Sequence, residues 1–437
     1  MNLLKLSWKN LTYKPLSMLL SILLFALGVG LIALLFLLED QVQKNFDKNL
    51  AGVDLVVGAK GSPLQLILSS MYHIDAPTGN ITIKEARPFL NPKHPLIQKA
   101  IPLSMGDSYG GYRIVGTTPD ILDFYEAQVA TGEVWQHNFE VTLGARVAAE
   151  RNLKLGDEFK SSHGFVDDED LAHADAPSFK VVGILAENGT VLDQLILTTN
   201  QTYWMVHEHG GEGDETAHDH SEEEHAHDDH DHAAHDHGEH AHEHDAPKPL
   251  TAAADDKDIT ALLLKFKGRN FQALNLQRNI NENTDMQAAT PAIEINRLYA
   301  LMNTGEQALR ILAIVIIIVS GLSIFISLFS SLKERKYELA LMRVMGATPS
   351  KLFSLIVLEG LILAFIGFLL GMLLSHGGMQ IFAGALKEAY RYSFSGLTFL
   401  PQELLLFAGA IGIGFLAAVL PAIQASKTDI SETLAEV

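Results

Sequence analysis

The chain has 437 residues, no cysteine and a hydrophobic share of 48%. It is too long for one ordinary soluble domain, and its apolar residues are too clustered for a protein that is soluble throughout. The formal net charge is −20, but residues 207–245 contain fifteen acidic residues and no Lys or Arg, so the rest of the chain carries only −5. The acidity gives no indication of nucleic-acid binding, which needs basic patches. The lack of cysteine excludes disulfides and thiolate metal sites.

Four apolar segments are long enough to cross a membrane, which takes about 20 helical residues. They are 16–38, 307–332, 352–375 and 403–424. A buried core helix is the alternative for any one of them, but the first three are too long for it. The first span follows basic residues, as a secretory signal does, yet no cleavage site follows it, so we predict an uncleaved anchor. The sequence therefore predicts four transmembrane helices.

Basic residues near the ends of the spans predict the orientation, because cytosolic loops of membrane proteins carry an excess of Lys and Arg. They gather before the first span, between the second and third spans, and after the fourth. We therefore expect the termini, 1–15 and 425–437, and the loop 333–351 to be cytosolic. The large segment 39–306 and the short loop 376–402 are then periplasmic.

The large outside segment alternates short apolar runs with turn residues, which predicts a mixed α/β domain. Five runs are typical of strands, namely 53–57, 139–143, 179–185, 195–199 and 261–266. Residues 144–152 predict a short helix. Residues 292–309 predict a helix that runs straight into the second span, and a continuous rod of this kind can carry motion through the membrane surface.

A low-complexity insertion at 207–249 holds thirteen of the nineteen histidines. Such a sequence cannot bury a core, so we expect it to be disordered without a ligand. His-x-His pairs recur every five residues from residue 225, and imidazole suits zinc, copper and nickel. The alternative is a solubilising acidic tract. We predict weak binding of a transition metal, preferably zinc, by His207, His209, His218, His220, His225, His227, His230, His232, His235, His237, His240, His242 and His244.

The loop 333–351 carries a charged run, then an amphipathic stretch in which Leu339, Met342 and Met345 recur at helical spacing. Residues 334–347 read Glu-Arg-Lys-Tyr-Glu-Leu-Ala-Leu-Met-Arg-Val-Met-Gly-Ala. This segment resembles the signature that follows the second membrane helix in the FtsX/MacB-like (type VII) ABC transporter permease family. Residues 421–430 are similar to the ending of that family. Parts of the outside domain also resemble the MacB-type periplasmic domain, namely 141–144 with Ala148, 155–157 and 182–193.

The resemblance implies a permease subunit in the bacterial inner membrane that transmits ATP-driven motion to its periplasmic domain. No Gly-x-x-x-x-Gly-Lys-Ser/Thr loop occurs in the chain, so we expect no catalysis and no intrinsic cofactor, with ATP bound by a separate cytosolic ABC ATPase. A second permease copy is an expected partner, as a homodimer or a heterodimer, and a periplasmic metal-binding or substrate protein is a further candidate.

The same resemblance assigns the contact with the ATPase to the loop 333–351. The alternative for this loop is a surface helix attracted to anionic lipid. The coupling residues it implies are Glu334, Arg335, Lys336, Glu338, Leu339, Met342, Arg343 and Gly346.

Glu359 is a carboxylate inside the third span, and intramembrane carboxylates by default indicate a function. Family members commonly carry Glu here, so we interpret it as a packing or hydrogen-bonding group between helices. Three functions stay open: mechanotransmission, metal-linked transport, and activation of a periplasmic partner without transport. The His-rich insertion departs from lipoprotein-releasing and macrolide-exporting members, so export or release of a lipoprotein, peptide or lipophilic substrate is kept only as an alternative.

Overall fold

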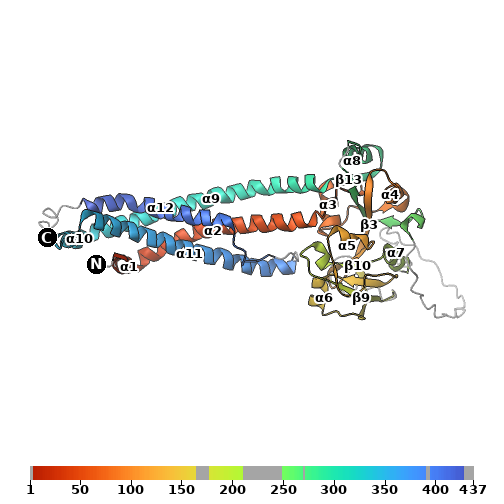
Figure 1. Cartoon of the computed structure of the whole chain (residues 1–437), viewed down its shortest axis with the longest axis horizontal. Helices are drawn as coiled ribbons and strands as arrows, with labels where there is room; N and C mark the ends of the chain where they lie inside the picture. The colour runs from red at the N-terminus through yellow and green to blue at the C-terminus, as the bar shows by residue number, and fades with distance from the viewer. Residues whose placement is uncertain (1–2, 164–176, 210–248, 269–270, 390–393, 428–437) are drawn as a thin grey trace, which may run out of the picture. The chain divides into compact units, whose positions relative to one another are not determined.

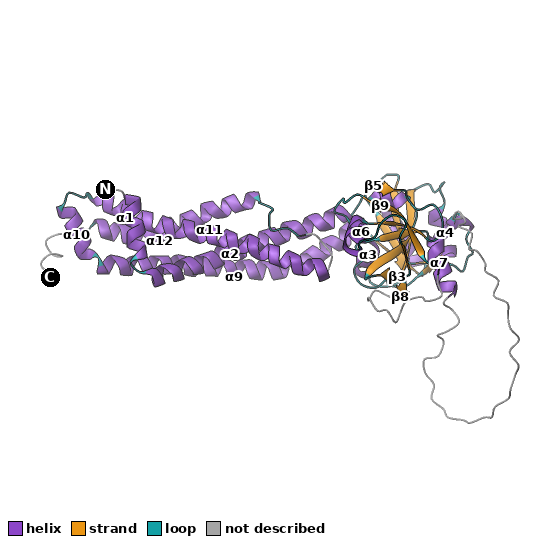
Figure 2. Cartoon of the chain, turned by 90° about the horizontal axis from the view of Figure 1, so that it is seen from below, coloured by secondary structure: helices purple, strands orange, loops and turns teal. Residues whose placement is uncertain are grey.

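The computed structural model describes residues 3–163, 177–209, 249–268, 271–389 and 394–427. The chain divides into two compact units, one formed by Met1–Asn45 with Leu298–Val437 and the other by Phe46–Arg297. The first is helical, and the described strands all belong to the second (Figure 2). Four candidate membrane helices with a mixed α/β domain between the first and second confirm the predicted fold class.

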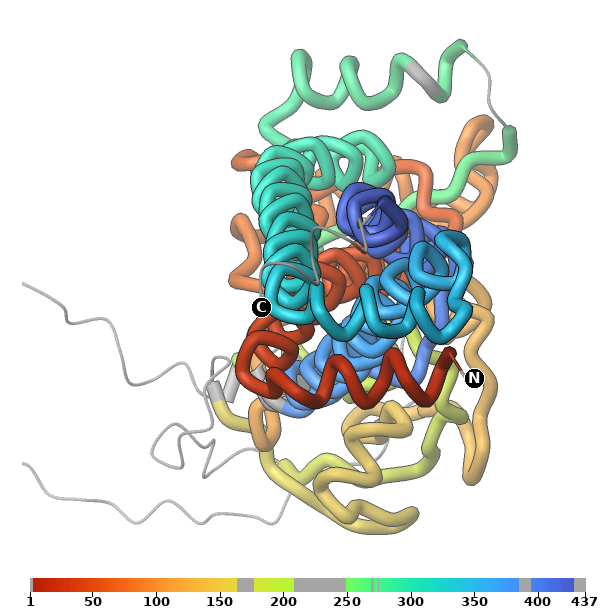
Figure 3. The backbone as a smooth tube through the Cα atoms, turned by 90° about the vertical axis from the view of Figure 1, so that its left-hand side faces the viewer, coloured from red at the N-terminus to blue at the C-terminus, as the bar shows by residue number. Residues whose placement is uncertain are grey.

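The helical unit is built on four long helices, which run side by side (Figure 1). They are α2 (Pro15–Asn49), α9 (Pro291–Glu334), α11 (Pro349–Ala389) and α12 (Pro401–Ser426). All four begin at a proline. The fixed φ of proline suits the first turn of a helix, and its lack of an N–H costs nothing there because the first N–H groups of a helix have no acceptor within the helix. Each contains an apolar stretch long enough to cross a membrane. Two short helices, α1 (Leu3–Thr12) and α10 (Lys336–Val344), lie across one end of the long ones (Figure 3).

The helix α9 is much longer than a membrane requires. Its 44 residues span about 66 Å at about 1.5 Å per residue, against about 30 Å of hydrocarbon. The predicted continuous helix through 292–309 into the second span is therefore confirmed. The helix α11 continues to Ala389, so much of the segment 376–402, which we expected as a loop, is helical.

The long helices pack through small and hydroxyl side chains. Between α2 and α9, Ser17 and Ser327 share a hydrogen bond of 2.9 Å, and Ser21 and Ser323 share one of 3.1 Å. In lipid no hydrophobic force draws helices together, so close packing and interhelical hydrogen bonds have to do so. These two hydrogen bonds, one turn apart, link α2 to α9.

Glycines bring α11 and α12 into contact. A Cβ added at Gly414 would lie 2.4 Å from Ala364 Cβ and 3.0 Å from the Gly360 carbonyl oxygen. In contrast, Gly409 and Gly412 of the same span would meet nothing within 4 Å. The glycines of this span thus differ in role, although their spacing in the sequence does not distinguish them.

The end of the helical unit away from α10 is held by polar contacts. Gln41 of α2 donates to the Ser395 carbonyl oxygen at 2.8 Å and accepts from the Ser395 amide at 2.7 Å. His376 Nδ1 lies 2.6 Å from the carbonyl oxygen of Gly396. The segment before α12 is therefore hydrogen-bonded to both α2 and α11.

The α/β unit is organised around one continuous sheet, in which the strands run in the order β13-β1-β12-β3-β4-β10-β6-β9-β5. β7 also pairs with β9 and β8 with β3, while β2 and β11 form a separate pair. The strands are β1 (Leu55–Ala59), β2 (Ile81–Thr82), β3 (Ile97–Tyr109), β4 (Tyr112–Gly116), β5 (Val129–Gly132), β6 (Glu140–Leu143), β7 (Glu158–Phe159), β8 (Ser162–His163), β9 (Phe179–Leu185), β10 (Ile196–Thr198), β11 (Asp258–Ile259), β12 (Ala261–Phe266) and β13 (Met286–Ala289).

The α/β unit also contains short helices. They are α3 (Pro63–Met71), α4 (Ile83–Leu90), α5 (Asp120–Phe124), α6 (Ala145–Arg151), α7 (Asn200–His209) and α8 (Phe271–Asn283), with 3-10 turns η2 (Val191–Gln194) and η3 (Leu250–Ala252). One hydrophobic core surrounds Leu55, Leu262 and Ile280, and a second surrounds Val141, Phe179 and Ile196.

The long strand β3 joins the two cores, because its first half pairs with β12 and its second half with β4. Strands lie at all five predicted positions, within two residues of the expected bounds, and α6 lies at the predicted short helix. β3 and β4 were not predicted.

The glycine contacts give a stability prediction. Gly414→Ala should destabilise the helical unit by about 1–3 kcal/mol, the usual cost of overpacking, because its Cβ would clash with Ala364. Gly412→Ala is the matched control, and it should be neutral or stabilising because the space there is open. Thermal unfolding of the full chain in detergent measures both. Equal shifts for the two variants would contradict the packing, and Ala364→Gly should partly rescue Gly414→Ala.

Candidate functional site

The helix α10 lies at one end of the helical unit and is bound to it along its inner face. Leu339 is buried and Met342 is half-buried. Both pack against a cluster that contains Leu332, Leu352, Leu355, Ile356, Ala422 and Ala425. Residues from the ends of α9, α11 and α12 therefore meet under α10.

A buried ion pair links the start of α10 to the third membrane span. Arg335, just before α10, has its Nη2 3.3 Å from Glu359 Oε2 of α11, and the two side chains are 12% and 1% exposed. The same Nη2 donates to Ser331 Oγ at 2.7 Å. The carboxylate of Glu359 also accepts from Asn10 Nδ2 at 2.7 Å. Glu359 is thus a structural partner of a predicted coupling residue.

The N-terminal helix takes part in this site, which the sequence did not reveal. Beside Asn10, Ser7 of α1 donates to the Leu355 carbonyl oxygen at 3.4 Å. Lys14 pairs with Glu334 at the surface. Polar residues spaced about one turn apart in α1 were the available signal, but only the tertiary structure shows that they face α11.

The outer face of α10 is exposed and largely apolar. It consists of Tyr337, Leu341, Val344 and Met345, of which Met345 is the most open at 73% exposed. The charged side chains of Lys336 and Glu338 are exposed beside them. Of the predicted stripe, Leu339 and Met342 face inward and only Met345 faces outward. The helix ends before Gly346, which has a φ of +97° that favours glycine.

Most of the predicted metal ligands lie outside the described residues. Of the thirteen histidines, only His207 has a described side chain, while His209 is the last residue of α7. Within the residues that the structure describes, no group of three or more His, Asp or Glu side chains is placed to hold a metal ion.

The isolated histidines His73 and His94 of the α/β unit differ in their surroundings, since His73 Nδ1 is buried and makes no described hydrogen bond while His94 accepts two. Burial, and then the charge of Arg113, lowers the pKa of His73 to about 3, so its ring is neutral. His94 accepts from the amides of Leu96 and Ile97, both at 3.2 Å. Neither ring faces a second histidine in the contacts described.

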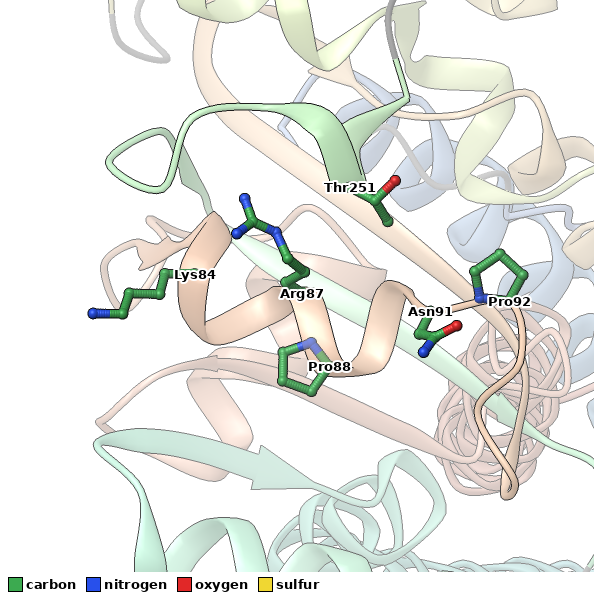
Figure 4. A pocket seen from close by; sticks show the side chains of 6 residues that line it. All are labelled: Lys84, Arg87, Pro88, Asn91, Pro92 and Thr251. Atoms are coloured by element: carbon green, nitrogen blue, oxygen red, sulfur yellow. The ribbon is translucent and has the colours of Figure 1, made fainter.

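A surface pocket of about 520 Å³ lies beside α4 and η3 (Figure 4). Its lining residues are Lys84, Arg87, Pro88, Asn91, Pro92 and Thr251. Arg87 is held by Asp255 and by the Ala253 carbonyl oxygen. The lining contains no carboxylate, so it offers no acid–base pair for catalysis.

Two family models match separate parts of the chain. Residues 310–430 match the family model described as FtsX-like permease C-terminal, and residues 18–218 match the one described as MacB-like periplasmic core domain. An ABC transporter permease, YtrF of Bacillus subtilis (strain 168), is 23% identical over 205 residues. That match covers 41% of this chain and 45% of the relative, so it spans about half of the relative's length.

One solved structure is also similar, the periplasmic region of MacB from Actinobacillus actinomycetemcomitans. It is 11% identical, and the TM-score is 0.31. The superposition covers 57% of this chain and 96% of that structure.

The buried ion pair gives a second prediction. Arg335→Ala should destabilise the chain by about 3–5 kcal/mol, because it leaves the Glu359 carboxylate buried without its cation. The neighbouring Glu334→Ala is the control; its pair with Lys14 is solvent-exposed, and such pairs contribute about 0–1 kcal/mol. Thermal unfolding in detergent compares them. If both variants unfold like the unaltered chain, the Arg335–Glu359 pair does not hold α10 in place.

Proposed function

We propose that the chain is an ABC transporter permease of the FtsX/MacB-like kind, a membrane subunit that transmits ATP-driven motion to its periplasmic domain; the two family-model matches support this. The observation that carries this proposal is α10, a short helix with an apolar outer face and an inner face bound to the ends of three long helices. The chain itself contains no phosphate-binding loop, so a separate cytosolic ABC ATPase supplies the force.

The polar contacts of α10 indicate how the force is distributed. The Arg335–Glu359 pair carries a push on α10 into α11, and Asn10 adds α1 to the same point. Arg335 directly follows α9, so the force also enters that helix at its end. A buried ion pair with several hydrogen bonds resists displacement, because each broken contact leaves a polar group unsatisfied at this depth.

The helices α2 and α9 then act as a coupled pair of rods. The two serine pairs join them in one half of the helical unit. In the other half Arg310 of α9 pairs with Glu39 of α2 at 3.2 Å. Their contacts are spread over the length of both helices, so the two helices move together. In this proposal both termini and α10 are cytosolic, and the permease works as a dimer beside two ATPase subunits.

The outer face of α10 gives the test of this proposal. Met345→Asp and Leu341→Asp place a charge on the proposed ATPase contact, so an ABC ATPase should no longer co-purify and ATP hydrolysis by the complex should be lost. Membrane insertion and thermal stability should not change, because both side chains are exposed. Leu397→Asp is the control, since Leu397 is also exposed but precedes α12 at the opposite end. Undiminished co-purification with both α10 variants would refute the contact.

A second function, metal handling, is favoured by the composition of the His-rich insertion. Thirteen histidines among fifteen acidic residues provide many imidazole ligands without a rigid shell around them. We propose that this segment binds zinc weakly at the periplasmic face. The bound zinc is then a transported substrate, a regulator of the permease, or a store that buffers the zinc concentration.

Zinc titration of the full chain tests the segment. We define the Asn-tract variant as the full chain in which the twelve histidines from residue 209 to 244 are replaced by Asn. Its acidic residues are unchanged. It should lose most of the zinc bound by the unaltered chain. The unaltered chain should release its zinc as the pH falls through about 6.5, where free imidazole becomes protonated. Equal stoichiometry in the two chains would make the segment a solubilising acidic tract.

A further inference from the structure

A second pocket of the α/β unit, of about 410 Å³, lies where two parallel strands end. β4 and β10 pair in parallel, and the residues that directly follow each of them line the pocket. The lining comes from four segments, which are 117–119, 135–136, 199–201 and 249–250. The loops that follow parallel strands converge at their carboxyl ends, and ligands commonly bind there. The fold therefore places this pocket at a favourable position for a binding site.

Three polar groups in the wall of this pocket have no hydrogen-bond partner among the described residues. They are the hydroxyls of Thr117 and Thr118 and the indole Nε1–H of Trp135. Thr117 and Trp135 are each 2% exposed. A buried polar group without a partner is costly, and native structures contain few of them. Three in one wall indicate that the pocket binds a molecule that supplies the missing partners.

The wall is built on the sheet. The amide of Trp135 donates to Thr142 Oγ1 of β6 at 3.1 Å. Asn200, at the start of α7, donates from Nδ2 to the Gly116 carbonyl oxygen of β4 at 2.9 Å. A Cβ at Gly116 would lie 3.0 Å from the Cα of Asn200, so the lack of a side chain there lets β4 end against α7. The backbone that carries the three polar groups is therefore held by β4, β6 and α7.

The lining determines the chemistry of the ligand. Its described residues carry hydroxyl, amide, indole and apolar side chains, and none of them is charged. A charged ligand buried here would lack a counter-ion, so the ligand is uncharged. Nε1 of Trp135 can only donate a hydrogen bond. The first N–H groups of α7, which begins at the pocket with Asn200, also have no acceptor within the helix. Both require an oxygen that accepts.

A peptide meets these requirements better than a sugar does. The main-chain carbonyl oxygens of a peptide only accept hydrogen bonds. A sugar brings hydroxyl protons that need acceptors and a ring face that packs on an exposed aromatic side chain, whereas the ring of Trp135 is buried. Pro119, Pro249 and Leu250 add apolar contacts at the same pocket. These contacts suit small apolar side chains on a short peptide.

We propose that this pocket binds a short, uncharged peptide segment through its main-chain carbonyl oxygens, with Trp135 Nε1 and the hydroxyls of Thr117 and Thr118 as donors. The donors are buried within the wall, so binding includes a small movement of the lining, and each hydroxyl turns by rotation about one side-chain bond. The site lies within the α/β unit and does not depend on the proposed permease function. The competing explanation is that ordered water alone satisfies the three groups.

The indole N–H signals of the full chain test the site. The chain has three tryptophans, so labelling with ¹⁵N-tryptophan gives three indole signals in the NMR spectrum in detergent, and Trp135→Phe identifies one of them. The probe is trialanine with an acetylated amino end and an amidated carboxyl end. It should shift the Trp135 signal downfield and saturably, because a carbonyl acceptor deshields the proton. An unmoved signal at about 10 mM peptide, which detects even millimolar affinity, would overturn the proposal in favour of water.

Trp204 of α7 is the internal control for this measurement. Its Nε1 already donates to the Asp258 carbonyl oxygen at 2.6 Å. Its signal should therefore stay in place while that of Trp135 moves. Equal shifts of the two signals would show non-specific binding of the peptide and would overturn the assignment to this pocket.

Thr117→Val and Thr118→Val separate binding from folding. Each removes a hydroxyl that has no described partner and keeps the branched shape, so the unfolding temperature should not fall. Each should weaken peptide binding by about 3- to 10-fold, the effect of one lost hydrogen bond. Thr251→Val is the matched control, because this exposed threonine of η3 lines the other pocket (Figure 4), and it should change neither quantity. Unchanged peptide affinity in both pocket variants would contradict the proposed donors.

Discussion

The buried pair of Arg335 and Glu359 ties several helices of the helical unit to one point. A carboxylate that is 1% exposed inside a membrane helix is costly unless its charge and lone pairs are satisfied. Here Arg335 and Asn10 both reach it, and Arg335 is itself held by Ser331. The start of α10, the end of α9, the last turn of α1 and the part of α11 around Glu359 therefore have to assemble together. That requirement makes α10 part of the helical unit.

The remaining packing of the helical unit follows from the solvent around it. Lipid tails are as apolar as leucine, so the long helices gain little from burying leucine against each other. They pack large apolar side chains such as Phe25, Leu328 and Leu363 together, and they also meet where small or hydroxyl residues allow close approach, as at Gly360 and Gly414 or at the serine pairs of α2 and α9. Many leucine and isoleucine side chains of these helices therefore face outward. Rigid contacts of this kind transmit displacement, because they cannot be compressed further.

The sheet of the α/β unit is interrupted by register shifts at several points. It is nevertheless continuous across two hydrophobic cores, and β3 connects them. The same strand shifts register near Asp107, and α7 approaches it there because residue 106 is glycine. The His-rich segment leaves the folded unit directly after α7.

The sequence by itself determined the membrane helices, five of the thirteen described strands and the approximate limits of the α/β unit. Span length and alternating apolar residues are local signals, because a segment buried in lipid or in a sheet needs them wherever it lies in the chain. It also placed the 333–351 loop among the candidate sites. Only the tertiary structure decided which face of α10 is free, because Leu339 and Met345 have the same polarity but different neighbours. It likewise decided that Glu359 pairs with Arg335 and that Asp107 faces His207, since these residues lie 24 and 100 positions apart and no local pattern connects them.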